Sequence, residues 1–245
     1  MVEMRPSLRL AALAAAAIAA AAVPAAASAA EVELGATHSP LVAPVCPPGL
    51  SSAQCTIILT RVTALETVRD GLAYPTKVKQ AGRITDFTVG LSQLSSNKAT
   101  QKSYIHYLDA TYGGTTQVAI TVLAPGGGKK SQFRWRVVAE SPVYHVEPYL
   151  GSVVQIPLDT SLEVMPGDVI GLTTPTWAPV LTIDINSKKF AYRQSRTSNC
   201  TSPPATTQAQ LTSNQTAGYT CDYPGTRVEY SATEVLYPLG TNPIH

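Results

Sequence analysis

Charged residues are scarce in this chain of 245 residues: Asp, Glu, Lys and Arg make up 14%, and the formal net charge at pH 7 is +2. A nearly neutral surface argues against partners that are held mainly by charge, such as nucleic acid or an anionic membrane. After the first thirty residues, no stretch is both long and apolar enough to cross a bilayer. We therefore expect no nucleic-acid partner and no membrane span in the mature protein.

Motifs for catalysis and metal binding are missing as well. The chain has no G-x-S-x-G sequence, which marks the nucleophile of one large class of hydrolases, and no H-E-x-x-H sequence or EF-hand loop. Residues 184–186, Asp-Ile-Asn, are a lone fragment of an acidic pattern. We therefore expect neither a metal ion nor a cofactor.

Helical periodicity is weak outside the N-terminal segment. The best candidate for a short helix is Thr63–Leu72, in which Leu65, Val68 and Leu72 recur at helical spacing, and Pro75 limits its length. Strand and helix patterns do not alternate along the chain, and no internal repeat is visible. The sequence therefore favours a single domain in which helix is a minor element.

The first thirty residues have the three-part pattern of a secretory signal. A start that carries two arginines is followed by an Ala/Leu/Ile run over residues 10–23, and Ala27-Ser28-Ala29 provides a small-x-small cleavage site. We expect residues 1–29 to be removed, with cleavage after Ala29 or Ala30. The mature protein should then be secreted, and it either diffuses freely or stays associated with the cell envelope.

Four cysteines remain after this cleavage: Cys46, Cys55, Cys200 and Cys221. An even number in an exported chain favours disulfides over free thiols, and three connectivities are possible. We favour Cys46 with Cys55 and Cys200 with Cys221, because each pair brackets a loop rich in Pro, Ser and Thr that little else would hold. A zinc site is the alternative, but the spacings are not of the short C-x2-C kind.

Apolar and polar residues alternate with a period of two through most of the chain. Phe133, Trp135 and Val137 point one way and Arg134 and Arg136 the other, because a helix would scatter them around its circumference. We expect this segment to be a strand with one wet face. The same alternation predicts further half-buried strands with the inward residues Phe87/Val89/Leu91, Val118/Ile120/Val122, Val154/Ile156/Leu158, Ile170/Leu172, Leu181/Ile183/Ile185 and Val228/Tyr230/Ala232.

These strands are separated by loops rich in Pro, Gly, Ser and Thr, as in antiparallel sandwiches. The sequence thus predicts an all-β protein, an antiparallel two-sheet β-sandwich that spans residues 55–238 as one domain. Residues 30–54 contain several prolines and no periodicity, so they are expected to form an extended lead-in held by the first disulfide. Residues 239–245 are expected to be a C-terminal tail.

Residues 81–87, 118–125, 133–141 and 161–172 have turn and strand patterns in the middle of the chain. In these segments the chain resembles a group of uncharacterised secreted β-sandwich proteins of high-GC soil bacteria. The likeness covers roughly residues 55–179 and implies a jelly-roll-like fold without implying an activity. Many such relatives end in an Asp-rich, calcium-binding tail, which residues 239–245 do not resemble, so no calcium is expected.

Tyrosine is the one residue type that indicates a function, since eleven tyrosines accompany only three phenylalanines. A flat apolar ring with a hydrogen-bonding tip suits contact with a polar ligand such as a sugar. Two loops concentrate such side chains, so Tyr144, Tyr149 and Trp177 are the candidate binding residues. The structural alternative is that these side chains fill the open end of the sandwich, the commoner place for large aromatics.

Three functional hypotheses follow. The first is a non-catalytic sandwich that binds a polysaccharide or a cell-envelope component through the aromatic loops. The second is an extracellular, glycosidase-like hydrolase that uses two carboxyl groups as acid and base. The third is an envelope component with a mechanical or steric role. The carboxylates available to the second hypothesis are Glu140, Glu147, Asp159 and Asp184.

Overall fold

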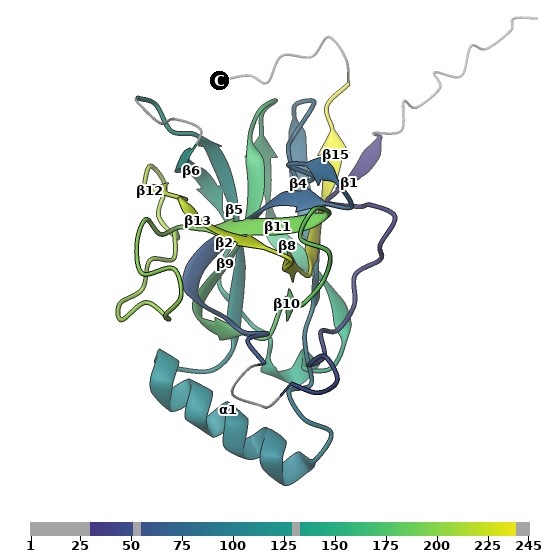
Figure 1. Cartoon of the computed structure of the whole chain (residues 1–245). Coiled ribbons are helices and arrows are strands. Elements are labelled where there is room, and N and C mark those ends of the chain that lie inside the picture. Colours follow the sequence, from purple (N-terminus) through teal and green to yellow (C-terminus); the bar gives the residue numbers. More distant parts are fainter. Residues whose placement is uncertain (1–29, 51–54, 129–132, 239–245) are drawn as a thin grey trace, which may run out of the picture.

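This computed structural model describes residues 30–50, 55–128 and 133–238. The predicted signal peptide, residues 1–29, and the predicted tail, residues 239–245, lie outside the described residues. Strands dominate the described part of the chain and form antiparallel sheets (Figure 1). Within the same ranges, no helix has the length and apolar character needed to cross a membrane.

Two main sheets face each other, and all strand pairs within them are antiparallel. The four-stranded sheet follows the order β1 (Glu31–Leu34), β15 (Tyr230–Leu236), β4 (Gly82–Gly90) and β8 (Val153–Val164). Seven strands of the nine-stranded sheet follow the order β12 (Thr216–Gly218), β6 (Arg134–Glu140), β5 (Gln117–Pro125), β9 (Val169–Ala178), β2 (Leu59–Arg69), β11 (Phe190–Gln194) and β13 (Cys221–Pro224). The other two strands of this sheet are β3 (Leu72–Ala73), which pairs with β2, and β7 (Tyr144–His145), which pairs with β5. A separate two-stranded sheet consists of β10 (Leu181–Thr182) and β14 (Arg227–Val228).

The order of the strands is that of a jelly roll. In one sheet β1-β15-β4-β8 are neighbours, and in the other β2-β9-β5-β6 are neighbours, so that the chain crosses repeatedly between the sheets in two Greek keys. The predicted all-β, two-sheet sandwich is thus confirmed. The segment between β9 and β15 is an insertion that adds β11 and β13 at one edge of the larger sheet and β12 at the other.

The larger sheet is strongly curled. Its two outermost strands, β12 and β13, lie at opposite edges, yet only Tyr219 and Thr220 separate them along the chain. The sheet must therefore bend round until both edges meet the same insertion, and its concave face encloses a second core. The buried residues of this second core are Leu65, Leu123, Trp135, Val137, Val169 and Tyr219.

The main core lies between the two sheets and contains most of the inward residues that the alternation predicted. Phe87, Ile120 and Leu172 are wholly buried there, as are Val228 and Tyr230. Burial of apolar side chains on this scale is the main driving force of folding. The two cores share the central strands of the curled sheet, which therefore have no solvated face.

The expectation of half-buried strands is wrong for the centre of the curled sheet and correct for its edge. Thr63, Thr121 and Thr173 project from the second face of β2, β5 and β9, and each is 0% exposed. Their hydroxyl groups satisfy one another, with oxygen separations of 2.7 Å and 2.6 Å. In β6, by contrast, Arg134 is exposed while Trp135 is buried, as predicted. The curl and the insertion cover the second face of β2, β5 and β9, but they leave the outer face of β6 exposed.

The helix expected at Thr63–Leu72 is absent, because this segment belongs to strand β2, which runs over Leu59–Arg69. β2 pairs with β9 on one side and with β11 on the other. The apparent helical spacing of its leucines and valines arose by chance, and hydrogen bonds to two neighbouring strands decide the outcome. Local propensity is a weak guide where such long-range pairing is available.

The structure instead has an α-helix, α1 (Lys98–Tyr112), that the sequence analysis missed. Asn97 begins it, because its Oδ1 accepts a hydrogen bond from the Thr100 amide at 3.0 Å. Gly113 ends it with a left-handed backbone, at φ 86°. Only Leu108 is buried among its residues, so the helix lacks the apolar stripe by which amphipathic helices are detected.

Both predicted disulfides are confirmed. Cys46 pairs with Cys55, and Cys200 pairs with Cys221, with Cα atoms 5.6 Å and 5.4 Å apart. The first closes a short loop of the lead-in, and the second ties the loop after β11 to strand β13. Disulfides of this kind persist in oxidising compartments, which fits an exported protein.

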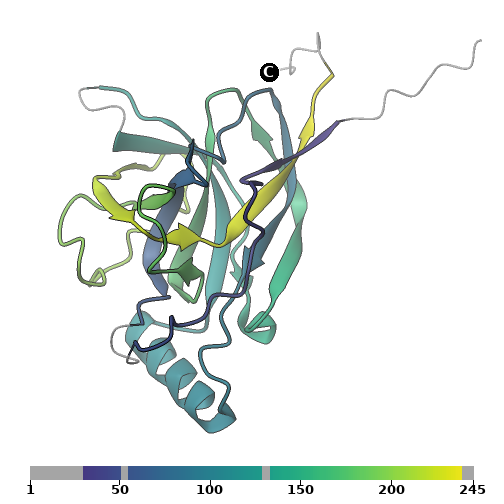
Figure 2. The ribbon, with the colours of Figure 1, turned by 45° about the vertical axis from the view of Figure 1, so that its right-hand side comes forward.

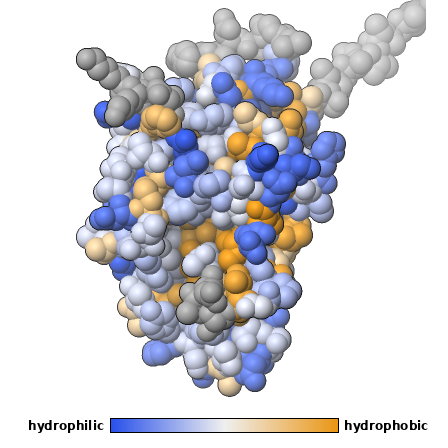
Figure 3. Space-filling view, viewed as in Figure 1, coloured by the Kyte–Doolittle hydropathy of each residue, from blue (hydrophilic) through white to orange (hydrophobic). Residues whose placement is uncertain are grey.

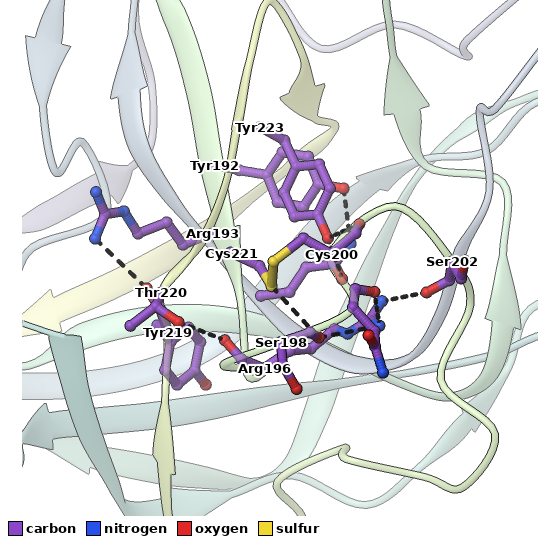
Figure 4. The surroundings of a disulfide bond; sticks show 12 residues. Tyr192, Arg193, Arg196, Ser198, Cys200, Ser202, Tyr219, Thr220, Cys221 and Tyr223 are labelled. Carbon is purple, nitrogen blue, oxygen red and sulfur yellow. Dashed lines mark hydrogen bonds between the residues drawn. A yellow bond between two sulfur atoms is a disulfide. The ribbon is translucent and has the colours of Figure 1, made fainter.

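The second disulfide lies in a well-connected frame (Figure 4). Tyr192 and Tyr223 stack beside it, with ring centroids 4.8 Å apart, and the Tyr223 hydroxyl donates to the Cys200 carbonyl at 2.6 Å. The Arg196 guanidinium donates to backbone carbonyls of the same loop, including that of Ser202 at 2.6 Å. The loop is therefore fixed on the edge of the curled sheet by contacts at several points.

The two sheets are joined by one buried arginine. Arg69, at the end of β2, is 1% exposed and forms an ion pair with Glu66 at 2.6 Å. Its guanidinium also donates to the carbonyls of Val228 at 2.8 Å and of Tyr230 at 2.9 Å, and to the carbonyl of Gly35. A side chain from the larger sheet thus holds the backbone of the smaller sheet and the start of the lead-in.

The lead-in follows the edge of the sandwich from β1 toward α1 (Figure 2). It begins with a strand, since β1 pairs with β15, and it continues as extended chain. Asp70 accepts two hydrogen bonds from Ser39, both 2.8 Å long, and Arg227 donates to the Pro40 carbonyl at 2.6 Å. The first disulfide is therefore one of several attachments that hold this segment against the sandwich.

Replacing Arg69 by alanine is expected to lower the free energy of unfolding by about 3–5 kcal/mol, because Glu66 would stay buried without its partner. Arg83→Ala is the control, since Arg83 is exposed and its loss should change stability by less than about 1 kcal/mol. Urea unfolding followed by tryptophan fluorescence measures both variants. Similar losses in the two would contradict the role assigned to Arg69.

Candidate binding surface

The side chain of Trp177 is buried and hydrogen-bonded inside the fold. It is 0% exposed, and its indole Nε1 donates to Asp109 Oδ1 at 2.9 Å and to the Gly114 carbonyl at 3.1 Å. Its ring is therefore covered by protein. This burial favours the structural alternative for Trp177 over direct contact with a ligand. Because Asp109 belongs to α1 and Gly114 follows it, Trp177 fixes this helix to β9.

The other two predicted aromatics differ in exposure. Tyr144 is half-buried and packs on Phe87 of the main core, with ring centroids 5.7 Å apart. Tyr149 lies in a single 3₁₀ turn, η2 (Glu147–Tyr149), and is 46% exposed. Of the three predicted binding residues, Tyr149 thus presents the largest free surface, and the three do not form a common platform.

A different aromatic surface lies beside helix α1. Tyr104 and Tyr107 face a cavity of about 190 Å³, and Tyr107 is 62% exposed. The wall of the cavity is mainly apolar and includes the first disulfide, so helix α1, the lead-in, the residues just before β2 and the segment between β4 and α1 all contribute to it. Hydrophobic surface also gathers on the face above the helix in Figure 3. The remaining lining residues are Cys46, Cys55, Ile57, Ile58, Leu94 and Leu108.

The helix that carries these tyrosines is firmly attached at its C-terminal end. Arg61 sits at an irregularity of β2 with a left-handed backbone, at φ 51°. Its guanidinium donates to the carbonyls of Thr111 at 3.1 Å, Tyr112 at 3.3 Å and Ala205 at 2.9 Å. These bonds satisfy carbonyls left open at the helix end and place a cation at the negative end of the helix dipole.

The tyrosine pair could have been found from two sequence signals. Asn97 and Gly113 are good start and stop residues for a helix, and Tyr104, Tyr107 and Leu108 have the i, i+3, i+4 spacing of one helix face. The pattern extends over a single turn, however, and the rest of the helix is polar. A search for long amphipathic periodicity therefore passes over it.

The four carboxylates of the hydrolase hypothesis lie on separate elements. Glu140 ends β6, and Glu147 lies in η2 beside His145 at a shallow hollow. Asp159 is exposed on β8, and Asp184 is exposed in the segment that follows β10. Side chains distributed over four elements do not by themselves make the closely spaced pair that glycoside cleavage requires.

The carboxyl groups whose pKa is clearly raised are others, and two of them are paired with arginines. Burial raises the pKa of Glu66 to about 7, although Arg69 lowers it in part, and burial also raises the pKa of Glu229. Both are in ion pairs with arginine, and Glu229 lies 2.8 Å from Arg227. These groups connect parts of the fold. Within the described ranges, no group of three His, Cys, Asp or Glu side chains could hold a metal ion.

Replacing Trp177 by phenylalanine is expected to lower the free energy of unfolding by about 1–3 kcal/mol, because Asp109 and the Gly114 carbonyl lose their indole donor. Amide hydrogen exchange should also become faster in α1 than in the strands of the main core. Tyr149→Phe removes one exposed hydroxyl and serves as the control, with no change in α1 expected. Unchanged exchange in α1 of the tryptophan variant would show that the indole does not hold the helix.

The described part of the chain thus offers one apolar, tyrosine-lined cavity beside α1, with its supporting bonds to Arg61 and Trp177. The four carboxylates of the hydrolase hypothesis do not line this cavity. A function has to be derived from these residues, because the chain matches no family model, no curated protein and no solved structure.

Proposed function

We propose that this protein is a secreted, non-catalytic binding module that holds a polysaccharide of the cell envelope on the surface formed by α1 and the first disulfide. The observation that carries the proposal is the cavity of about 190 Å³ faced by Tyr104 and Tyr107. This is the class of function that the sequence predicted, but the proposed binding residues are those of helix α1 and not those of the loops. Tyr149 remains available as an additional contact.

The chemistry of the cavity fits one face of a sugar ring. The C–H face of a pyranose is apolar and packs against aromatic rings, while tyrosine hydroxyl groups accept and donate hydrogen bonds to its hydroxyls. The cavity is smaller than the roughly 300–1,000 Å³ of most ligand pockets, so one ring fills it. We expect weak affinity for a single sugar, with a Kd of about 1 mM, and stronger retention on a polymer that offers many copies.

A non-catalytic role is supported by the surroundings of the carboxyl groups. A general acid needs a raised pKa and a place at a cleft where it meets the substrate. Glu66, Glu229 and Glu234 have raised pKa values, but they are at most 1% exposed, and the first two are bonded to arginines inside the fold. None of the three is exposed enough to contact a polymer on the surface.

Export is supported by the two disulfides, and the rigid attachment of α1 favours binding at low entropic cost. Asn97, Gly113 and Arg61 fix the helix ends, and Trp177 fixes the helix to β9. A preorganised surface loses less conformational freedom when it binds a ligand than a mobile loop does. These features together favour a fixed recognition surface that works outside the cytoplasm.

Retention on insoluble polysaccharides and on purified cell walls tests the proposal. The double variant Tyr104→Ala/Tyr107→Ala is expected to lose at least about tenfold in retention. Each aromatic contact contributes about 0.5–1.5 kcal/mol to binding, and a tenfold change in affinity corresponds to about 1.4 kcal/mol. His106→Ala is the matched control, since His106 is an exposed residue of the same helix between the two tyrosines. It should bind like the wild type.

Two outcomes would overturn the proposal. One is an absence of retention of the wild-type protein on a broad panel of glycans and on cell walls. The other is retention that the double variant keeps in full. Release of soluble sugar from the polymer during incubation would favour the hydrolase hypothesis instead, and replacement of Glu140, Glu147, Asp159 and Asp184 would then identify its acid and base.

A further inference from the structure

A second cavity lies at the opposite end of the sandwich from α1, between the two sheets. It has a volume of about 380 Å³ and is enclosed by β1 and β15 on one side and by the segment from β3 to Gln80 on the other. In Figure 1 the strands β1 and β15 lie at the upper right, away from the helix. Its apolar walls include Val32, Leu34, Leu72 and Leu236.

One carboxylate at this cavity has an oxygen without a hydrogen-bond partner among the described residues. Glu234 lines the cavity and is 1% exposed, and its Oε1 is buried without a hydrogen-bond partner among the described residues. An unsatisfied buried carboxylate is costly, so such groups are rare in native structures and call for an explanation. Here burial raises the pKa of Glu234 to about 7.

The other buried glutamates show what is missing at this position. Glu66 has Arg69 at 2.6 Å, and Glu229 has Arg227 at 2.8 Å. Each of these carboxylates therefore has a cation supplied by the protein, whereas none of the ion pairs among the described residues involves Glu234. Among the described residues no arginine lines this cavity, and its basic lining residues are Lys77 and Lys79.

The space around Glu234 is kept by a glycine. Gly82 lies beneath it on β4, and a Cβ atom there would be 2.9 Å from Glu234 Oε1 and 2.5 Å from the Val235 carbonyl oxygen. Any other residue would displace the carboxylate or the strand. Pairing is also irregular between Thr233 and Glu234, and such bulges reorient side chains.

The lining of the cavity also carries two lysines and a second glutamate. Lys77 and Lys79 line it and are exposed, and Glu33 lines it from β1 while its Oε2 accepts a hydrogen bond from Thr233. A ligand that satisfies this arrangement has a cation at its inner end and an anion at its outer end. The apolar walls between them fit a short hydrocarbon chain.

We propose that this cavity binds a small zwitterion with an ammonium group at one end, a carboxylate at the other and a short apolar chain between them. The ammonium pairs with Glu234, the chain packs between Leu34, Leu72 and Leu236, and the carboxylate meets Lys77 and Lys79. Amino acids with a terminal amine have this chemistry. The site is separate from the surface of α1, so it stands independently of the proposed polysaccharide binding.

Isothermal titration with three matched probes tests the proposal: 6-aminohexanoate, hexylamine and hexanoate. We expect 6-aminohexanoate to bind most tightly, hexylamine more weakly, and hexanoate not at all. Glu234→Gln should weaken binding of 6-aminohexanoate by at least about tenfold, since the loss of a buried ion pair is larger than 1.4 kcal/mol. Glu33→Gln makes the same chemical change at the exposed mouth and should have little effect.

Binding should also release protons near neutral pH. An ammonium at Glu234 stabilises the carboxylate, so a group that is partly protonated at pH 6 must lose its proton when the ligand binds. Affinity should therefore rise from about pH 6 to about pH 8. Titration in two buffers of different ionisation enthalpy measures the protons released, and Glu234→Gln should release none. The other charged groups that line this cavity are Glu33, Lys77 and Lys79.

Three results would overturn the proposal. They are hexanoate binding as tightly as 6-aminohexanoate, an unchanged affinity in a folded Glu234→Gln variant, and binding without proton release at pH 6. The double variant Lys77→Ala/Lys79→Ala adds a further check. It should remove the advantage of 6-aminohexanoate over hexylamine, and an undiminished advantage would show that the lysines do not contact the carboxylate.

Discussion

The architecture depends on the buried guanidinium of Arg69. It comes from the end of β2 in the larger sheet and bonds to Glu66, to backbone carbonyls of β14 and β15, and to the carbonyl of Gly35. A buried cation that loses one of its partners lowers the stability of the fold strongly, so the native fold needs all these segments in place. One side chain thereby couples the two sheets and the lead-in, and packing of the main core occurs around a fixed junction.

The curl of the larger sheet is the second organising feature. An insertion between β9 and β15 contributes strands to both edges of the sheet. Tyr219, which lies between β12 and β13 in the chain, is buried in the second core. Central strands that would have a wet face in an ordinary sandwich are covered on both sides, and threonine hydroxyls there bond to one another. The second disulfide and the stacked pair Tyr192–Tyr223 hold the insertion in this position.

The two cavities use the jelly roll in different ways. The cavity beside α1 is a surface feature, made where a helix and the first disulfide loop meet outside the sandwich. The cavity of Glu234 lies between the sheets, at the end where β1 and β15 pair. The first favours a flat apolar face and the second a small charged molecule, because tyrosine rings line one and an unpartnered carboxylate lies in the other.

Local patterns in the sequence determined the class of fold and the covalent frame. Alternation in segments such as Arg134–Val137 indicates strands, and each cysteine pair brackets its own loop, so both were predictable. Only the tertiary structure decided which side chains meet water. Trp177 is covered because α1 packs on it, Thr121 because the sheet curls, and Glu234 because β1 and the β3 segment enclose it. Burial depends on segments far away in the chain, and neither periodicity nor spacing reports which of them arrive.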